Sequence, residues 1–343
     1  MNRNPLPDFL KGFAVFLIIP VHILETLIDY PGRESLFGKI LLFLGGPVAV
    51  PIFMMVMGYF VAISKKSTTQ NLVRGALIFL LGFLLNIGMN FHLLLKIKFA
   101  GWQFDPLQYI FGVDIFYLAG IAIMLLSILK NIKKGQLAIL FALIIFVSAT
   151  TSYLNSVLLV ADSGYILPFI AGKYSWSYFP LFPWLAYPLL GFLFQKLEKQ
   201  LRIFFQKKKV ISYGILASVL LLVLLFSNYG IETTINLTEY YHHSFLFFLW
   251  TLGVDILWFV LLWLLVQKFA EFPLIVFLRW LGKNITVFYV IQWLIIGNIA
   301  TAIYQTQELS TYGYWFSAIF LITIIITYLY EKIKLKNIRS TLN

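Results

Sequence analysis

Cysteine is absent from this chain of 343 residues, and charged side chains make up only 12% of it. The lack of cysteine excludes disulfides, thiolate nucleophiles and cysteine-ligated metals, and it leaves the redox compartment open. Soluble domains carry roughly 25% charged residues, so this chain has too little charge to cover a water-exposed surface. The solvent for most of the chain is therefore lipid.

Hydrophobic residues make up 61% of the chain and aromatic residues 18%. The hydrophobic residues form stretches long enough to cross about 30 Å of hydrocarbon as helices. They lie near residues 9–28, 40–63, 72–91, 107–129, 136–158, 178–197, 210–227, 245–267, 284–303 and 313–331. The sequence thus predicts an all-α polytopic membrane protein of about ten transmembrane helices.

The basic residues indicate how these helices are oriented. If the N-terminus is cytoplasmic, 21 of the 26 Lys and Arg residues fall in inside segments. The five outside are Arg33, Lys39, Lys96, Lys98 and Lys173. This is a strong positive-inside bias, and it predicts that both termini face the cytoplasm of a bacterial inner membrane. The net charge of +12 is then explained by the basic residues of the cytoplasmic segments, which also attract anionic lipid. No nucleic-acid partner is expected.

The chain shows no internal repeat, no low-complexity segment and no linker that would separate two domains. The longest outer segments, 92–106, 159–177 and 228–244, are too short to fold alone. We therefore expect a single transmembrane domain over residues 1–343.

Ionisable residues inside a span are costly and point to function by default. Lys11 and His22 are separated by eleven positions, which is three turns plus roughly 20°, so they share a helix face about 16 Å apart. Asp114 lies about two turns into the fourth predicted span, at roughly the depth of His22. Alternatively, His22 is a helix–helix hydrogen-bond partner, Lys11 a snorkelling lysine and Asp114 a paired structural acid.

Six segments, on the first four, the sixth and the ninth of the predicted helices, combine glycine with polar or aromatic residues. They read DFLKGFA at 8–14, PVAVPIF followed by Met57-Gly58 at 47–58, NLVRGAL at 71–77, GVDIFYLAG at 112–120, FPWLAY followed by Gly191 at 182–191, and LGKNITVFY followed by Gln292 at 281–292. Their order resembles the transmembrane acyltransferase superfamily. This superfamily comprises the acyltransferase-3 enzymes, the heparan-α-glucosaminide N-acetyltransferase catalytic domain and the DUF418 group. Lys11 stands where the family usually has arginine, and Gln292 where the last motif closes on histidine.

The resemblance implies transfer of an acyl group from acyl-CoA, with acetyl-CoA the expected co-substrate, to a hydroxyl or amine, and it implies no metal. Lys11 and Arg74 would attract the CoA phosphates. His22 would act as general base or carry the acyl group itself, and Asp114 would orient its imidazole.

Asn284 and Gln292 are expected to hydrogen-bond to the developing oxyanion. The expected acceptor is a sugar or lipid-linked glycan that approaches from outside, where His242 and His243 would contact it. Those two histidines equally suit an interfacial anchor.

Two other functions fit the same residues. A transporter or flippase would use the intramembrane His and Asp residues as a path, although no inverted repeat accompanies them. A noncatalytic relative of the acyltransferase fold would explain the replacements at Lys11 and Gln292.

Overall fold

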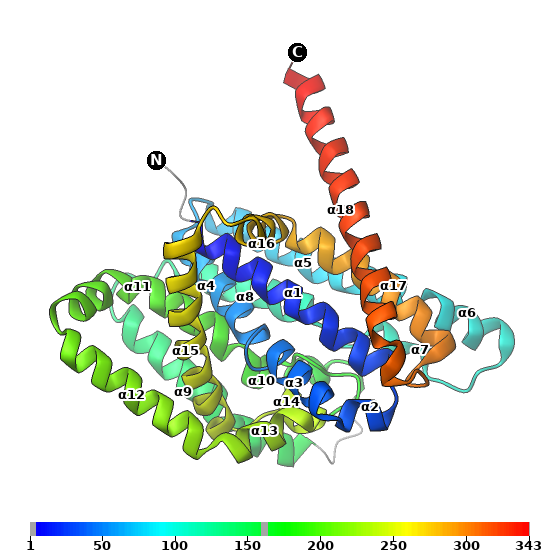
Figure 1. Ribbon diagram of the computed structural model, residues 1–343, viewed down its shortest axis with the longest axis horizontal. Coiled ribbons are helices and arrows are strands. Elements are labelled where there is room, and N and C mark those ends of the chain that lie inside the picture. The colour runs from blue at the N-terminus through cyan, green and yellow to red at the C-terminus, as the bar shows by residue number, and fades with distance from the viewer. Residues whose placement is uncertain (1–4, 159–163, 343) are drawn as a thin grey trace. The chain divides into compact units, whose positions relative to one another are not determined.

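The computed structural model describes the backbone of residues 5–158 and 164–342 and side chains up to Lys336, and it is almost entirely helical (Figure 1). Within those ranges the only β-type pairings are two isolated bridges, Ile28 with Gln307 and Val113 with Ser177. The predicted all-α polytopic class is confirmed.

Helices lie at each of the ten apolar ranges. They are α1 (Leu6–Leu27), α3 (Leu36–Gly45) with α4 (Val50–Ile63), α5 (Thr68–Met89), α7 (Pro106–Ile110) with α8 (Ile115–Leu129), α9 (Gln136–Leu158), α11 (Ala186–Lys207), α12 (Lys209–Leu225), α15 (Phe245–Phe269), α17 (Ile285–Ile303) and α18 (Tyr312–Leu342). Among the described residues, seven helical segments are long and apolar enough to cross a membrane, or up to eight if α11 and α12, bent by 108°, form one span. The number of about ten spans stays a prediction. The remaining apolar helix, α8, has 15 residues.

The connecting segments are more helical than the sequence suggests. They contain α2 (Tyr30–Glu34), α6 (Phe91–Ala100), α10 (Leu181–Trp184), α13 (Ser227–Ile235), α14 (Leu237–Tyr241), α16 (Pro273–Lys283) and the 3-10 turns Leu167–Phe169 and Leu309–Thr311. Segment 92–106 is thus largely helix α6, and segment 228–244 is largely α13 and α14.

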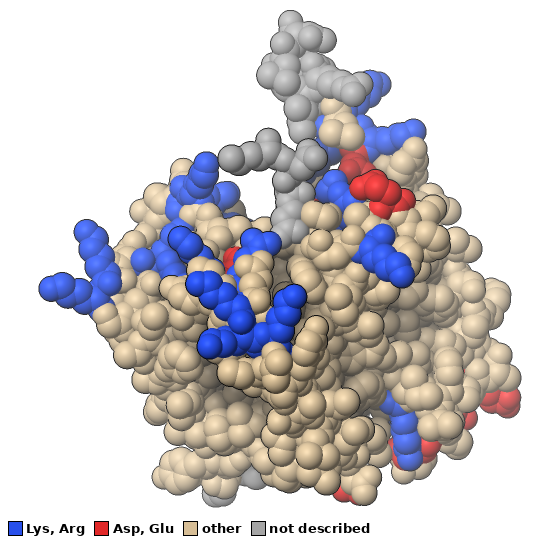
Figure 2. Space-filling model, turned by 60° about the vertical axis from the view of Figure 1, so that its left-hand side comes forward, with Lys and Arg blue, Asp and Glu red and all other residues tan. Residues whose placement is uncertain are grey.

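Large apolar side chains are exposed along the longest helices. In α12, Val210 is 84% exposed and Leu225 68%, and none of the helix's residues is buried. Figure 2 shows one face of the molecule, where residues other than Lys, Arg, Asp and Glu cover most of the surface. In water such a surface would aggregate, whereas lipid tails solvate it, so the chain is an integral membrane protein.

The described chain forms two compact units. Unit 1 comprises Met1–Gly45, Ile87–Phe104 and Trp263–Asn343, and unit 2 comprises Gly46–Asn86 and Asp105–Leu262. Each unit is assembled from separate stretches of sequence, so no single cut of the chain isolates either one. The single domain over 1–343 stays a prediction.

In unit 1, α16 crosses the N-terminal half of α1 at backbone contact (Figure 1). A Cβ added to Gly12 would lie 1.7 Å from the Leu278 carbonyl oxygen, and one added to Gly282 would lie 1.8 Å from that of Asp8. Membrane helices approach this closely only where small residues meet. The first and last of the six glycine-bearing segments therefore pack against each other.

The other four segments pair within unit 2. Added Cβ atoms on Gly58 and Gly191 would lie 1.9 Å and 1.8 Å from carbonyl oxygens of the facing helix, α11 for Gly58 and α4 for Gly191. Gly75 and Gly120 likewise face each other, since an added Cβ on either would lie within 2.7 Å of the other's carbonyl oxygen. The six segments thus form three glycine-mediated helix crossings, which the linear order of the motifs does not reveal.

The orientation in the membrane stays a prediction, and the absence of cysteine makes it simple to test. Ser67 and Thr306 are exposed and lie in segments predicted to be inside and outside. In intact cells, Cys at position 67 should resist a membrane-impermeant maleimide, while Cys at position 306 should react with it. The reversed labelling pattern would overturn the orientation with both termini inside.

Candidate active site

His22 lies in the C-terminal part of α1, where side chains of α17 pack around its imidazole. Its Nδ1 atom is 3.3 Å from Nε2 of Gln292. The Trp293 ring is tilted against the imidazole with 4.1 Å between ring centroids, and the Tyr289 ring meets it edge-on at 6.0 Å. All four residues belong to unit 1, so the structure brings together His22 and Gln292, both singled out from sequence.

The contact between His22 and Gln292 controls which imidazole nitrogen can act as a base. If the Gln292 amide N–H donates to Nδ1, the ring proton sits on Nε2 and Oε1 of Gln292 is left buried with no hydrogen-bond partner in the described chain. If the amide is turned over, Nδ1–H donates to Oε1 and Nε2 keeps a free lone pair. Amide orientation follows from the hydrogen-bond network, and only the second arrangement provides a base at Nε2.

Lys11 lies one turn inside the N-terminus of α1 and pairs with Asp8 of the same motif. Its Nζ is 2.9 Å from Oδ1 of Asp8, whose side chain is 4% exposed. The positive charge of Lys11 is therefore partly balanced within the protein, which the sequence analysis did not anticipate. Exposed Lys283 ends the helix α16 that packs on this part of α1.

Asn284 joins α16 to α17 and donates a side-chain hydrogen bond of 3.2 Å to the Trp280 carbonyl. Eight residues separate it from Gln292, which is about 12 Å along a helix. Of the two amides, Gln292 is the one that contacts His22, and a role of Asn284 at the oxyanion stays a prediction.

Asp114 is not two turns into a span, as predicted, but is the N-cap of α8. Its Oδ1 accepts a hydrogen bond of 2.7 Å from the Ile115 backbone N–H. The helix breaks before it, and the side-chain amide of Asn86 donates to the carbonyls of Ile110 and Gly112 that the break exposes. Aspartate is among the best N-caps, which explains the break. Orientation of His22 by Asp114 stays a prediction.

Arg74 is exposed on α5 in unit 2. The structure gives it no role beyond a cation at the surface of that helix, so its part in binding a CoA phosphate stays a prediction.

His242 and His243 lie between α14 and α15 and are 4% and 1% exposed. Both ring nitrogens of His243 are occupied, because Nδ1 is 2.8 Å from the Tyr240 carbonyl and Nε2 is 3.0 Å from the Tyr187 hydroxyl. Burial lowers the pKa of His243 to about 3. His243 is thus a neutral residue that ties the connecting segment to α11, with neither nitrogen available to an acceptor.

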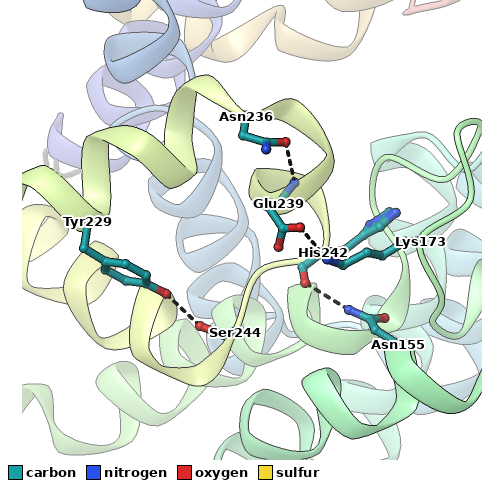
Figure 3. Close-up of polar contacts among 7 residues, drawn as sticks. All are labelled: Asn155, Lys173, Tyr229, Asn236, Glu239, His242 and Ser244. Atoms are coloured by element: carbon teal, nitrogen blue, oxygen red, sulfur yellow. Dashed lines mark hydrogen bonds and ion pairs between the residues drawn. The ribbon is translucent and has the colours of Figure 1, made fainter.

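The side-chain amide of Asn155 donates a hydrogen bond of 3.0 Å to the backbone carbonyl of His242 (Figure 3). The ion pair of Lys173 with Glu239 lies beside this contact. Burial, reinforced by the Lys173 cation, lowers the pKa of His242 to about 4. Its Nδ1 has no hydrogen-bond partner within the described ranges. Contact of His242 with an acceptor stays a prediction.

Trp293 is a site residue that the sequence reasoning missed, and Tyr289 closes the quoted segment LGKNITVFY but was given no role. They lie one residue after and three residues before Gln292, so both flank the closing position of the last motif. Tyr289 and Trp293 are four residues apart, so they share a helix face, and that spacing was a usable signal. Aromatic residues are so frequent here, at 18%, that Trp293 did not stand out.

A comparison with protein-family models matched one family, described as an acyltransferase domain, over residues 4–332. Comparisons with curated proteins and with solved structures found no match. The match covers nearly the whole chain, including α1 with His22 and α17 with Gln292. The chain therefore belongs to the acyltransferase-3 family, whose members are membrane acyltransferases.

Proposed function

We propose that the protein transfers an acyl group, with acetyl the preferred group, from cytoplasmic acyl-CoA to a hydroxyl or amine of a sugar or lipid-linked glycan. The observation that carries the proposal is the His22–Gln292 contact, at 3.3 Å. It places a protonatable imidazole, oriented by a neutral amide, inside a membrane helix. The bacterial inner membrane is the proposed location.

In the proposed reaction, Nε2 of His22 removes the proton of the acceptor as its oxygen or nitrogen attacks the thioester carbonyl. The carbon–sulfur bond then breaks, and the CoA thiolate takes the proton back from the imidazolium. Gln292 is a positioning residue, because its Oε1 would hold the Nδ1 proton and keep Nε2 basic. General base catalysis of this kind is typically worth 10²–10⁴ in rate.

The donor would bind with its phosphates at the N-terminal end of α1, about 16 Å from His22. Lys11 is charge-paired with Asp8, so it would share phosphate binding with neighbouring cations of the same unit such as Lys283. The acceptor would enter from the opposite side.

The test is acyl-CoA turnover by purified protein. Acetyl-CoA is incubated with detergent-purified protein, alone or with a panel of soluble and lipid-linked glycans. Released CoA is read with a thiol reagent, which reports no protein thiol because the chain has no cysteine. Glycan-stimulated CoA release supports the transferase. No release with any acceptor would instead favour the transporter or the noncatalytic relative.

Lys11 should govern donor affinity rather than the chemical step. Lys11→Met combined with Asp8→Asn removes both charges of the pair without leaving a buried lone carboxylate, and it should raise the acetyl-CoA KM while kcat stays near that of the wild type. Lys11→Arg should keep or improve affinity, because a guanidinium has enough donors to hold Asp8 and a phosphate together. Titration calorimetry with CoA measures the affinity directly.

The matched control for Lys11 is Lys39, which pairs with Glu34 at 3.3 Å in the same unit. Lys39→Met with Glu34→Gln should leave CoA affinity unchanged. Equal CoA affinity in the wild type and in the Lys11/Asp8 variant would exclude Lys11 from donor binding.

A further inference from the structure

The indole of Trp293 differs from those of its neighbours in unit 1. The Nε1–H of Trp280 donates to Glu331 at 2.6 Å, and that of Trp315 donates to Gln307 at 3.3 Å. Nε1 of Trp293 is shielded from solvent but has no hydrogen-bond partner among the described residues. An indole nitrogen can only donate a hydrogen bond. A buried donor left in this way calls for an explanation.

The unsatisfied donor lies at the proposed base. The Trp293 and His22 rings are 4.1 Å apart between centroids at an interplanar angle of 38°. The preceding residue, Gln292, is fully buried, and one end of its amide also lacks a partner. When Oε1 accepts from His22, that unpaired end is the N–H₂ group. Two unpaired donors, the Trp293 indole and the Gln292 amide, would then flank the imidazole.

We propose that the Nε1–H of Trp293 binds the oxyanion that forms when the thioester carbonyl is attacked, with the Gln292 amide as second donor. This inference rests on the proposed acyl transfer. As the acceptor loses its proton to His22 and bonds to the carbonyl carbon, the carbonyl electron pair moves to oxygen, which becomes the anion that Trp293 meets. When the C–S bond breaks and the CoA thiolate leaves, this electron pair re-forms the carbonyl double bond.

A donor that lacks a partner in the resting protein suits this role physically. It gains its acceptor only as negative charge develops, so its interaction is stronger in the transition state than in the ground state, which is the condition for acceleration. Loss of one oxyanion donor typically lowers kcat by about 10²–10³-fold. The tryptophan is thus a catalytic residue as well as the packing surface for His22.

The test replaces the N–H and keeps the ring. Trp293→Phe removes the donor, and incorporation of benzothienylalanine at position 293 replaces the N–H with sulfur in a ring of nearly the same shape. Both should lower the kcat of acetyl-CoA cleavage by about 10²–10³-fold, with CoA affinity unchanged. Trp315→Phe is the matched control, since it removes an indole that already has a partner, and it should keep wild-type kcat.

Each remaining outcome has a definite meaning. Turnover within about threefold of wild type in the benzothienylalanine protein would overturn the role of the N–H, even if Trp293→Phe lowers activity through lost packing or yield. If His22→Ala abolishes turnover while benzothienylalanine does not, the inference on Trp293 fails and the proposed acyl transfer stands. Wild-type turnover in His22→Ala would overturn both.

Discussion

His22→Ala is expected to lower the kcat of CoA release by about 10²–10⁴-fold, the range associated with removal of a general base. The protein should still insert into the membrane and purify as a monodisperse species, because His22 is part-exposed and the rest of α1 packs through buried apolar residues such as Ile19 and Ile23. CoA affinity should persist, since the phosphates would bind about 16 Å away. Turnover per monodisperse protein and calorimetric CoA affinity are the two measurements.

The control is His92→Ala, the same change in the same unit, at a histidine whose Nδ1 lies 3.2 Å from the Asn298 carbonyl. His92→Ala should turn over at the wild-type rate. A histidine at position 22 that only supports the fold would give the opposite pattern, with low yield and low stability but normal turnover per folded molecule.

The second large effect is expected on stability. Gly12→Ala places a methyl group where the Leu278 carbonyl oxygen is only 1.7 Å away. The obstacle is backbone, which cannot rotate aside, so α1 and α16 must separate. Overpacking typically costs 1–3 kcal/mol, and this site should reach at least about 3 kcal/mol. The unfolding midpoint of detergent-purified protein, or the failure to recover monodisperse protein, measures the effect.

Gly214→Ala provides the comparison, because a Cβ at Gly214 in α12 has no heavy atom within 4 Å. There the usual helix preference for alanine over glycine applies, so the midpoint should stay the same or rise slightly. If Gly12→Ala melts at the wild-type midpoint, the close crossing of α1 and α16 is wrong.

Much of the architecture follows from local sequence properties. Scarce charge and long apolar runs predict a membrane protein because lipid is the only solvent for such a surface. Helices are expected at these runs because a backbone in lipid must satisfy its own hydrogen bonds. His22 could be singled out from sequence for the same local reason, since an ionisable group inside a span needs an explanation. Asp8 and Lys11 form an ion pair three residues apart, which helix geometry alone permits.

What surrounds His22 was decided by tertiary packing. Gln292 is 270 positions away in the chain, and periodicity within α1 or α17 reports which residues share a face but not which faces meet. Asp114 caps α8 instead of lying inside it, because a side-chain cap and the Asn86 amide compensate a helix break that hydropathy cannot register. His243 has both nitrogens occupied by Tyr187 and Tyr240 for a similar reason. The way in which helices cross determines which partners a buried polar group has. Here the crossings depend on glycines such as Gly12 and Gly282, and only the tertiary structure shows that their backbones are in contact.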